Sequence, residues 1–234
     1  TFHHYFDDPD VVRPLRRMRP VVFTNHSSQF LAALAEGKSA ELLARIGFAD
    51  AVIAPSRELV EATVACGYPE AATFYVPNGV DPSRFRPDAD ARARICRSLE
   101  LDPTLPIVLC ARSPFHKNGV IHFVDALRRL GESGLRLTVL FAGLAPAPRP
   151  DEIAYTTRLR EAVRALPSAI AVRMLGAVRN EEVPALHAAA DLGVLPSLME
   201  ATSIAGLESM SCGTPIVGST VGGIAEIVRD GITG

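Results

Sequence analysis

Short apolar runs rich in β-branched residues alternate with helix-patterned segments along most of the chain, and this alternation constrains the fold more than any other feature. Strand–helix alternation with short links is typical of a parallel sheet with helices on both faces. The sequence therefore predicts an α/β protein. The predicted strands are 21–24, 51–54, 73–76, 107–110, 137–141, 169–172, 192–195 and 216–217. The predicted helices are 57–65, 89–99, 120–130, 152–165, 181–189 and 203–211.

Residues 80–106 interrupt this alternation, because several prolines surround one short polar helix and no core strand. A domain boundary is expected there. The predicted organisation is a partial first domain over 1–82, a linker over 83–104, and a nearly complete second domain over 105–234.

Composition excludes several classes of protein. The 234 residues are 48% hydrophobic and 21% charged, as in ordinary soluble domains, and the net charge of −2 offers no general attraction for nucleic acid. No apolar run approaches the length of about 20 residues that spans a bilayer. The 4 cysteines form no C-x-x-C pair and are interpreted as reduced thiols of a cytoplasmic protein.

The two ends of the chain lead to two further expectations. The sequence begins without Met and ends in a turn at Asp230–Gly234, so we expect an internal part of a longer protein, truncated at both ends. Near the start, Arg13, Arg16, Arg17 and Arg19 form a basic run. This run is either a solvated surface segment or a contact with substrate phosphate or anionic lipid, which would make the protein peripheral to a membrane.

The segment that follows the predicted strand 192–195 holds two glutamates, Glu200 and Glu208. In open parallel sheets, ligands bind beyond the carboxyl ends of the strands. A helix that starts near Ser203 would direct its unpaired first-turn amides at an anion such as a diphosphate, with Ile204, Leu207 and Met210 on its buried face. The two carboxylates could then accept hydrogen bonds from a sugar and a ribose diol. On spacing alone, an acidic residue before a helix and an exposed helical glutamate remain the simpler interpretation.

Three motifs, in order along the chain, resemble those of family 4 glycosyltransferases. They are Val76-Pro-Asn-Gly-Val-Asp81, then Arg112-x₄-Lys117 after a strand, then Glu200-x₇-Glu208 followed by Cys212-Gly-Thr-Pro215 and Val221-Gly-Gly. The resemblance implies the GT-B fold, with two Rossmann-like parallel-sheet domains. It also implies a retaining, metal-independent transfer of a sugar from a nucleoside-diphosphate sugar to an acceptor hydroxyl.

The resemblance also implies roles for individual residues. Arg112 and Lys117 would hold the donor diphosphate, although a plain surface pair is the alternative. Glu200 would bind the donor sugar and Glu208 the ribose. The phosphates and the sugar would be bound by the backbone amides around Thr202, Ser203 and Ile204. Because Ala201-Thr202-Ser203 replaces the commoner Gly-Phe-Gly, the donor stays open among UDP-, GDP- and ADP-sugars.

Two other residue patterns are weighed against plainer explanations. His26 follows a predicted strand where this family often has a histidine near the donor sugar, and a capping or core histidine is the rival interpretation. Asp88-Ala-Asp90 has the form of a metal-binding D-x-D motif, but its position before a helix favours capping. Neither a metal nor a cofactor is expected.

The function expected from the sequence is glycosyl transfer to a glycan, a lipid-linked sugar or a small molecule. One alternative is a catalytically inactive subunit that binds nucleotide sugars or acts as a scaffold, and another is an epimerase of the same fold. The presence of Arg112, Lys117, Glu200 and Glu208 together favours the transferase. The chain by itself is expected to bind nucleotide weakly and to turn over little, because the opening strand of the first domain is absent.

Overall fold

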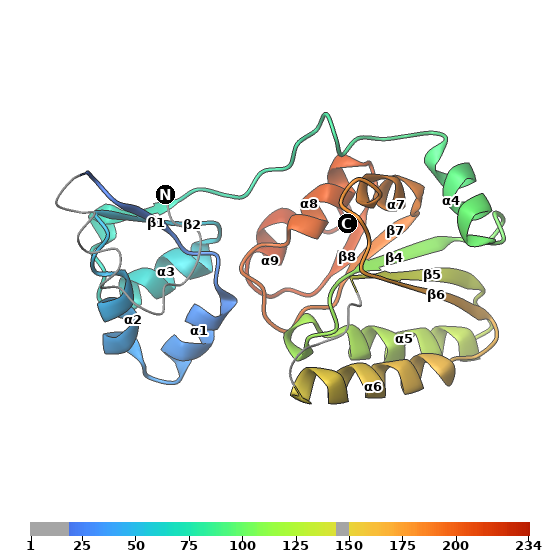
Figure 1. Ribbon diagram of the computed structural model, residues 1–234, viewed down its shortest axis with the longest axis horizontal. Helices are drawn as coiled ribbons and strands as arrows, with labels where there is room; N and C mark the ends of the chain where they lie inside the picture. The colour runs from blue at the N-terminus through green and yellow to red at the C-terminus, as the bar shows by residue number, and fades with distance from the viewer. Residues whose placement is uncertain (1–18, 144–149) are drawn as a thin grey trace. The chain divides into compact units, whose positions relative to one another are not determined.

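The computed structural model describes residues 19–143 and 150–234, which form two compact units (Figure 1). The first unit takes the chain up to Asn78 together with Met199–Thr202. The second takes Gly79–Leu198 and Ser203–Gly234. Most of the basic run, Arg13 to Arg17, lies outside the described residues.

The first unit contains a 3-stranded parallel sheet in the order β1-β2-β3. Its core holds Phe30, Leu42, Val52 and Leu59, all of which are fully or almost fully buried. The strands are β1 (Val22–Thr24), β2 (Ala51–Ala54) and β3 (Thr73–Tyr75). The helices are α1 (Ser28–Ala35), α2 (Ser39–Ile46), α3 (Arg57–Ala65) and the 3₁₀ turn η3 (Glu70–Ala72).

The second unit contains a 5-stranded parallel sheet in the order β6-β5-β4-β7-β8. The strands are β4 (Ile107–Ala111), β5 (Leu137–Ala142), β6 (Ile170–Gly176), β7 (Leu192–Leu195) and β8 (Ile216–Gly218). The helices are α4 (Ala91–Leu99), η4 (His116–Asn118), α5 (Val120–Glu132), α6 (Pro150–Arg164), α7 (Val183–Ala189), α8 (Ile204–Ser211) and α9 (Ile224–Ile227). The predicted parallel α/β class is confirmed.

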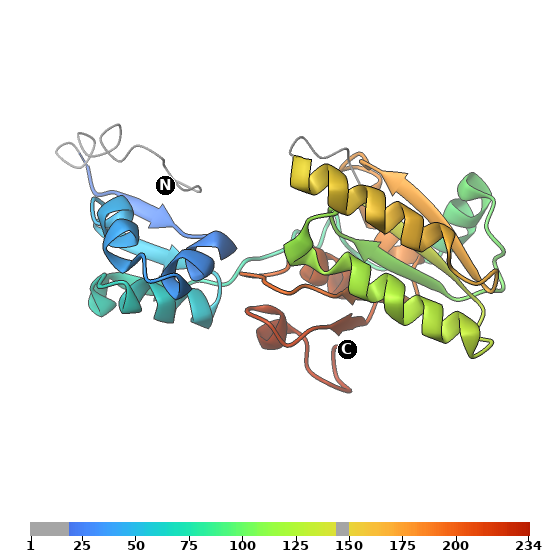
Figure 2. The ribbon, with the colours of Figure 1, turned by 90° about the horizontal axis from the view of Figure 1, so that it is seen from below.

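Helices cover both faces of this second sheet, as the continuous apolar strands require. Within β4, Val108 and Cys110 join the core beneath α5 and α6, whereas Ile107 and Leu109 join the core beneath α4 and α7. Figure 2 shows α5 and α6 lying side by side over one face. Residues 83–104, predicted as a linker, group with the second unit, and their helix α4 packs against α7.

The strand order creates a place where a ligand can enter. The chain builds β5 and β6 on one side of β4 and then crosses to build β7 and β8 on the other side. Ligands of open parallel sheets bind at such a switch point, beyond the carboxyl ends of the strands. The loops after β4 and β7 are therefore the first place to look for a site. Among the described helices, none has the length and apolar character needed to cross a lipid bilayer.

Candidate functional site

Arg112 lies at the switch point, directly after the last residue of β4. Its Nη2 donates to Ser197 Oγ over 2.7 Å and to Asn118 Oδ1 over 3.1 Å. Asn118 is buried, and its amide Nδ2 donates to the carbonyl of Ser113 over 2.9 Å. The loop after β4 is therefore closed on itself and joined to the loop after β7 by a guanidinium group. Arg112 is half-buried and lies at the edge where a diphosphate was predicted to bind.

The backbone brings these loops together as closely as the side chains do. The amide of Leu198 donates to the carbonyl of Lys117 over 2.8 Å. Gly119 has a φ of 63°, and a Cβ at this position would overlap the carbonyl oxygen of Pro196. Only glycine combines that φ with such a close approach at little cost. Lys117 lies on η4, in the same loop as Arg112, and its side chain is exposed.

A third loop, after β8, completes the edge. Ser219 Oγ donates to the carbonyl of Ser197 over 2.6 Å, so the position of Ser197 is set from both sides. Sequence analysis did not single out Ser197, Asn118 or Ser219. The available signal for Ser197 was its place immediately beyond a predicted strand, where parallel sheets expose functional side chains.

Helix α8 begins at the same edge, as predicted. Its N-cap is Ser203, a fully buried residue whose Oγ accepts from the amide of Gly206 over 3.2 Å. The other first-turn amides of a helix have no partner within the helix, and such amides can bind an anion. The amide of Ile204 belongs to this first turn.

The predicted buried face of α8 is wrong. Ile204 is 52% exposed, and Leu207 and Met210 are only half-buried, whereas Gly206 and Ser209 are buried. The helix packs on its small residues: a Cβ on Gly206 would lie 2.9 Å from Leu195 Cδ1 and 3.1 Å from Ile227 Cδ1. Close approach of the helix to β7 therefore decides which side of it is covered.

A cavity of about 180 Å³ adjoins the first half of α8. Its wall is mostly apolar, and among the described residues that line it, His187 and Glu208 are the titratable side chains. The lining residues are Leu109, Ala111, Ala142, Gly143, Val178, Val183, Leu186, His187, Ala205 and Glu208. An apolar wall with one carboxylate suits a flat ring attached to a diol. Sequence analysis expected Glu208 here but missed Gly143, Val178 and His187, which come from three different elements.

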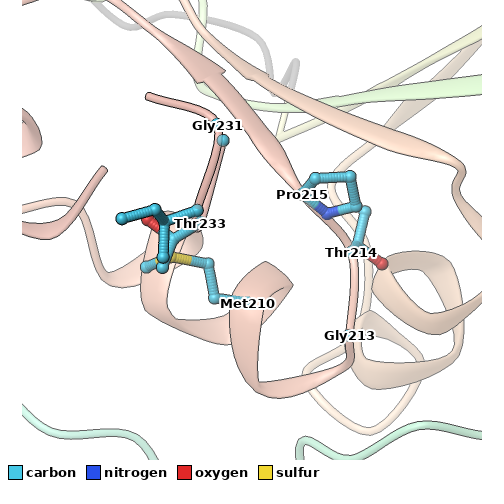
Figure 3. A pocket seen from close by; sticks show the side chains of 8 residues that line it. Met210, Gly213, Thr214, Pro215, Gly231 and Thr233 are labelled. Carbon is cyan, nitrogen blue, oxygen red and sulfur yellow. The ribbon is translucent and has the colours of Figure 1, made fainter. Parts of the chain in front are cut away.

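A second cavity is larger but chemically poorer. It has a volume of about 420 Å³ and lies between the end of α8 and residues 231–234. Figure 3 shows Met210 reaching toward Thr233, with Pro215 opposite. Its lining carries no charged side chain, and Thr214 Oγ1 donates to the carbonyl of His187 over 2.6 Å. Size and chemistry therefore point to different cavities. Chemistry favours the smaller one for a nucleoside, because its Glu208 can accept hydrogen bonds from a ribose diol and its apolar wall can contact a base.

Three predicted site residues belong to the first unit. Glu200 and Thr202 lie in Met199–Thr202, where Thr202 is buried and Glu200 is half-buried. His26 is half-buried and lies in the loop after β1, the position that the sequence predicted. It follows Asn25, whose backbone N–H donates to the carbonyl of Ile53 over 2.8 Å. The proposed contacts of Glu200, Thr202 and His26 with a donor sugar stay predictions.

The Asp88-Ala-Asp90 motif makes the contacts of a helix start. Asp88 pairs with Arg94 at 2.5 Å and accepts from the amide of Asp90 over 3.0 Å. The hydrogen bond from Arg94 is the main reason that the pKa of Asp88 lies below its ordinary value. Asp88, rather than the N-cap residue Asp90, makes the side-chain contact at the start of α4.

The fold and the site together define a class of protein: a two-unit parallel α/β protein with a half-buried arginine at the switch point of its second sheet. The chain belongs to the family described as Glycosyl transferases group 1, which matches residues 92–234. Residues 2–84 match the family described as Glycosyltransferase Family 4. The resemblance to family 4 glycosyltransferases of the GT-B fold is confirmed.

Individual relatives agree with this assignment. The alpha-maltose-1-phosphate synthase of Mycobacterium tuberculosis is 34% identical over 165 residues, which are 68% of this chain and 40% of that protein. A D-inositol 3-phosphate glycosyltransferase of Streptomyces bingchenggensis is 30% identical over 231 residues, covering 92% and 50% respectively. The crystal structure of Anabaena HepE in complex with UDP and glucose has a TM-score of 0.78 at 23% identity, covering 92% of this chain and 56% of HepE. The chain thus spans about half the length of the relatives it matches.

Proposed function

We propose that the protein transfers a glycosyl group from a nucleoside-diphosphate sugar to an acceptor hydroxyl, with retention at the anomeric carbon. The observation that carries the proposal is the Arg112 guanidinium, which is bound to Ser197 at the switch point of the second sheet. This edge presents a fork-shaped cation, a lysine and helix amides, which together suit a diphosphate.

These groups would act on the leaving group. As the bond between the anomeric carbon and the diphosphate oxygen breaks, that oxygen keeps the electron pair and gains negative charge. Arg112, Lys117 and the first-turn amides of α8 would stabilise that charge more strongly than the charge of the bound donor. The acceptor oxygen forms the new bond to the anomeric carbon, and its proton passes to the departing diphosphate oxygen. Because protein cations can fulfil this role, we infer that no metal ion is needed.

The nucleoside would occupy the smaller cavity. Glu208 would accept hydrogen bonds from the ribose hydroxyls, and the apolar wall near Gly143 and Val178 would contact the base. The complexes of HepE with UDP and glucose support a nucleotide-sugar donor, and UDP-, GDP- and ADP-sugars are all candidates. In the first unit, Glu200 and His26 would bind the donor sugar.

The proposal also includes the acceptor and the location of the protein in the cell. The acceptor is a glycan, a lipid-linked sugar or a small molecule, with contact to a membrane surface in the lipid-linked case. The cysteines Cys66, Cys96, Cys110 and Cys212 are buried free thiols, which is consistent with a reducing cytoplasmic location.

Calorimetry with UDP, GDP and ADP tests the donor site. The wild-type protein is expected to bind one of the three, and the double variant Arg112→Ala, Lys117→Ala is expected to lose that binding by at least about a hundredfold. The matched control is Arg97→Ala, Arg128→Ala, which also removes two exposed positive charges from helices of the second unit. The control should bind as the wild type does.

Comparing the two double variants distinguishes a specific nucleotide site from a general attraction to positive charge. Equal losses in both double variants would mean that overall charge, rather than the loop after β4, attracts the nucleotide. Wild-type protein that is folded yet binds none of the three nucleotides would overturn the proposed function. Retention and metal independence are tested by following the anomeric configuration of the product by NMR, with and without a chelator.

A further inference from the structure

His187, on α7, is held in one position inside the second unit. Its side chain is 1% exposed and its Nδ1 lies 2.6 Å from Ser209 Oγ on α8. Its ring packs edge-on against Phe85, with ring centroids 6.2 Å apart and an interplanar angle of 68°. An imidazole fixed on these sides has little freedom to reorient.

The other ring nitrogen, Nε2, faces Glu208, the residue proposed to bind the ribose. His187 Nε2 lies 3.5 Å from Glu208 Oε2, which is longer than a hydrogen bond, and it has no hydrogen-bond partner among the described residues. A buried polar nitrogen without a partner costs free energy and calls for an explanation. His187 also lines the smaller cavity, where Glu208 is the only other titratable side chain.

The contact with Ser209 fits either tautomer of a neutral ring, because a hydroxyl can donate or accept. If the Ser209 hydroxyl donates to Nδ1, the ring proton is on Nε2 and points toward the Glu208 carboxylate. The opposite tautomer would set the lone pair of Nε2 against a carboxylate oxygen, which is repulsive. The geometry therefore makes Nε2 a donor aimed at Glu208.

We propose that His187 is a positioning residue that holds the Glu208 carboxylate in place for the ribose diol of the donor. The proposal rests on the proposed function of this site. When a nucleoside fills the cavity and excludes water from Glu208, the gap of 3.5 Å closes to a hydrogen bond. Glu208 Oε2 is then oriented from α7, and the carboxylate can accept from both ribose hydroxyls.

The test compares a ribonucleotide with one that lacks the diol. Calorimetry is run with UDP, GDP and ADP and with their 2′,3′-dideoxy forms, using the base that the wild type binds. The wild type is expected to prefer the ribonucleotide by about tenfold. His187→Phe keeps a packed ring but removes both nitrogens, so it should weaken ribonucleotide binding by about fivefold and leave dideoxynucleotide binding unchanged.

Three further variants strengthen the comparison. His187→Gln keeps an N–H donor on a side chain of similar reach and should restore part of the ribose preference. Ser209→Ala removes the partner of Nδ1 that holds the ring in place and should reduce the preference by a smaller factor. His122→Phe is the matched control, because His122 is an exposed histidine on α5, and it should leave the preference unchanged.

Each outcome has a separate meaning. If His187→Phe weakened both nucleotides equally, the ribose preference would be undiminished and His187 would have a general packing role. That outcome would overturn the positioning role and leave the proposed function intact. Should His187→Phe fail to fold, the comparison of His187→Gln and Ser209→Ala with the wild type decides the question in the same way. A wild type that binds no nucleotide would overturn this proposal together with the proposed function.

Discussion

Arg112 Nη2 donates to Ser197 Oγ over 2.7 Å, although the two residues are 85 positions apart in the chain. This bond joins the end of β4 to the end of β7, which are neighbouring strands. Ser197 is almost fully buried and is fixed in turn by Ser219. The arginine that would hold the donor diphosphate is therefore oriented by a serine from another loop.

Ser197→Ala is expected to weaken nucleoside-diphosphate binding by about threefold to tenfold, because Arg112 loses one of its orienting acceptors while Asn118 remains. Calorimetry measures the effect. Ser98→Ala is the control, because Ser98 is an exposed serine on α4 whose Oγ donates to the carbonyl of Ile95, within its own helix. Unchanged affinity in Ser197→Ala would show that Ser197 is not needed to orient the guanidinium.

Gly119→Ala is expected to destabilise the protein and weaken nucleotide binding, because the new Cβ would push Pro196 and its loop away from Arg112. Gly134→Ala is a matched control, since Gly134 has a φ of 88° but nothing within 4 Å of an added Cβ. The control should lose about 1 kcal/mol for the backbone conformation alone. Urea unfolding measures both, and Gly119→Ala should lose at least about 2 kcal/mol. Equal losses would contradict the close approach of the two loops.

Ser203→Ala and Ser56→Ala are expected to cost similar stability but to differ in function. Each serine is a fully buried N-cap, of α8 and α3 respectively, and accepts from a first-turn amide. Loss of either cap should lower the free energy of unfolding by about 1 kcal/mol. Only Ser203→Ala should weaken nucleotide binding, because α8 begins at the proposed diphosphate site. Thermal unfolding and calorimetry on both variants check this, and parallel losses of binding would count against a site at α8.

The burial of Cys110 predicts a loss of stability at alkaline pH. Burial raises the pKa of this thiol to about 12, so the folded state keeps a proton that the unfolded state releases. The stabilisation is complete below the ordinary pKa of a thiol and is lost as the pH rises toward about 12. Over that window, Cys110 should lower the free energy of unfolding by up to about 1.4 kcal/mol per pH unit.

Urea unfolding at a series of alkaline pH values measures this slope. Cys110→Ala should show a shallower fall than the wild type. Val108→Ala is the control, because Val108 is buried in the same strand and core but carries no titrating group. A slope in Cys110→Ala as steep as in the wild type would mean that other groups cause the alkaline loss.

Helices α1 and α2 show a limit of prediction from sequence patterns. Both were missed, and neither has a side-chain hydrogen bond at its N-cap, Ser27 for α1 and Lys38 for α2. By contrast, α3 was predicted with its ends, because Ser56 caps its start and Gly67, with a φ of 100°, follows its end. Local capping bonds leave a signal in sequence, whereas helices held mainly by packing leave a weaker one.

The face of α8 shows a different limit. Its apolar spacing predicted burial of Ile204, but Gly206 and Ser209 are the residues that meet the sheet. Spacing tells which residues share a face of a helix, and it does not tell which face a neighbouring strand approaches. Here small residues allow the closer contact, so packing overrode hydrophobicity.

The sequence by itself determined the parallel α/β class, the family, and the placing of Arg112 and of Glu208 after strands of the second sheet. Periodicity and short motifs are local, and they survive in the chain without knowledge of its neighbours. Only the tertiary structure decided that Ser197 orients Arg112 and that His187 faces Glu208. These two contacts depend on the order of strands in the sheet and on how α7 packs beside α8, which no local pattern encodes.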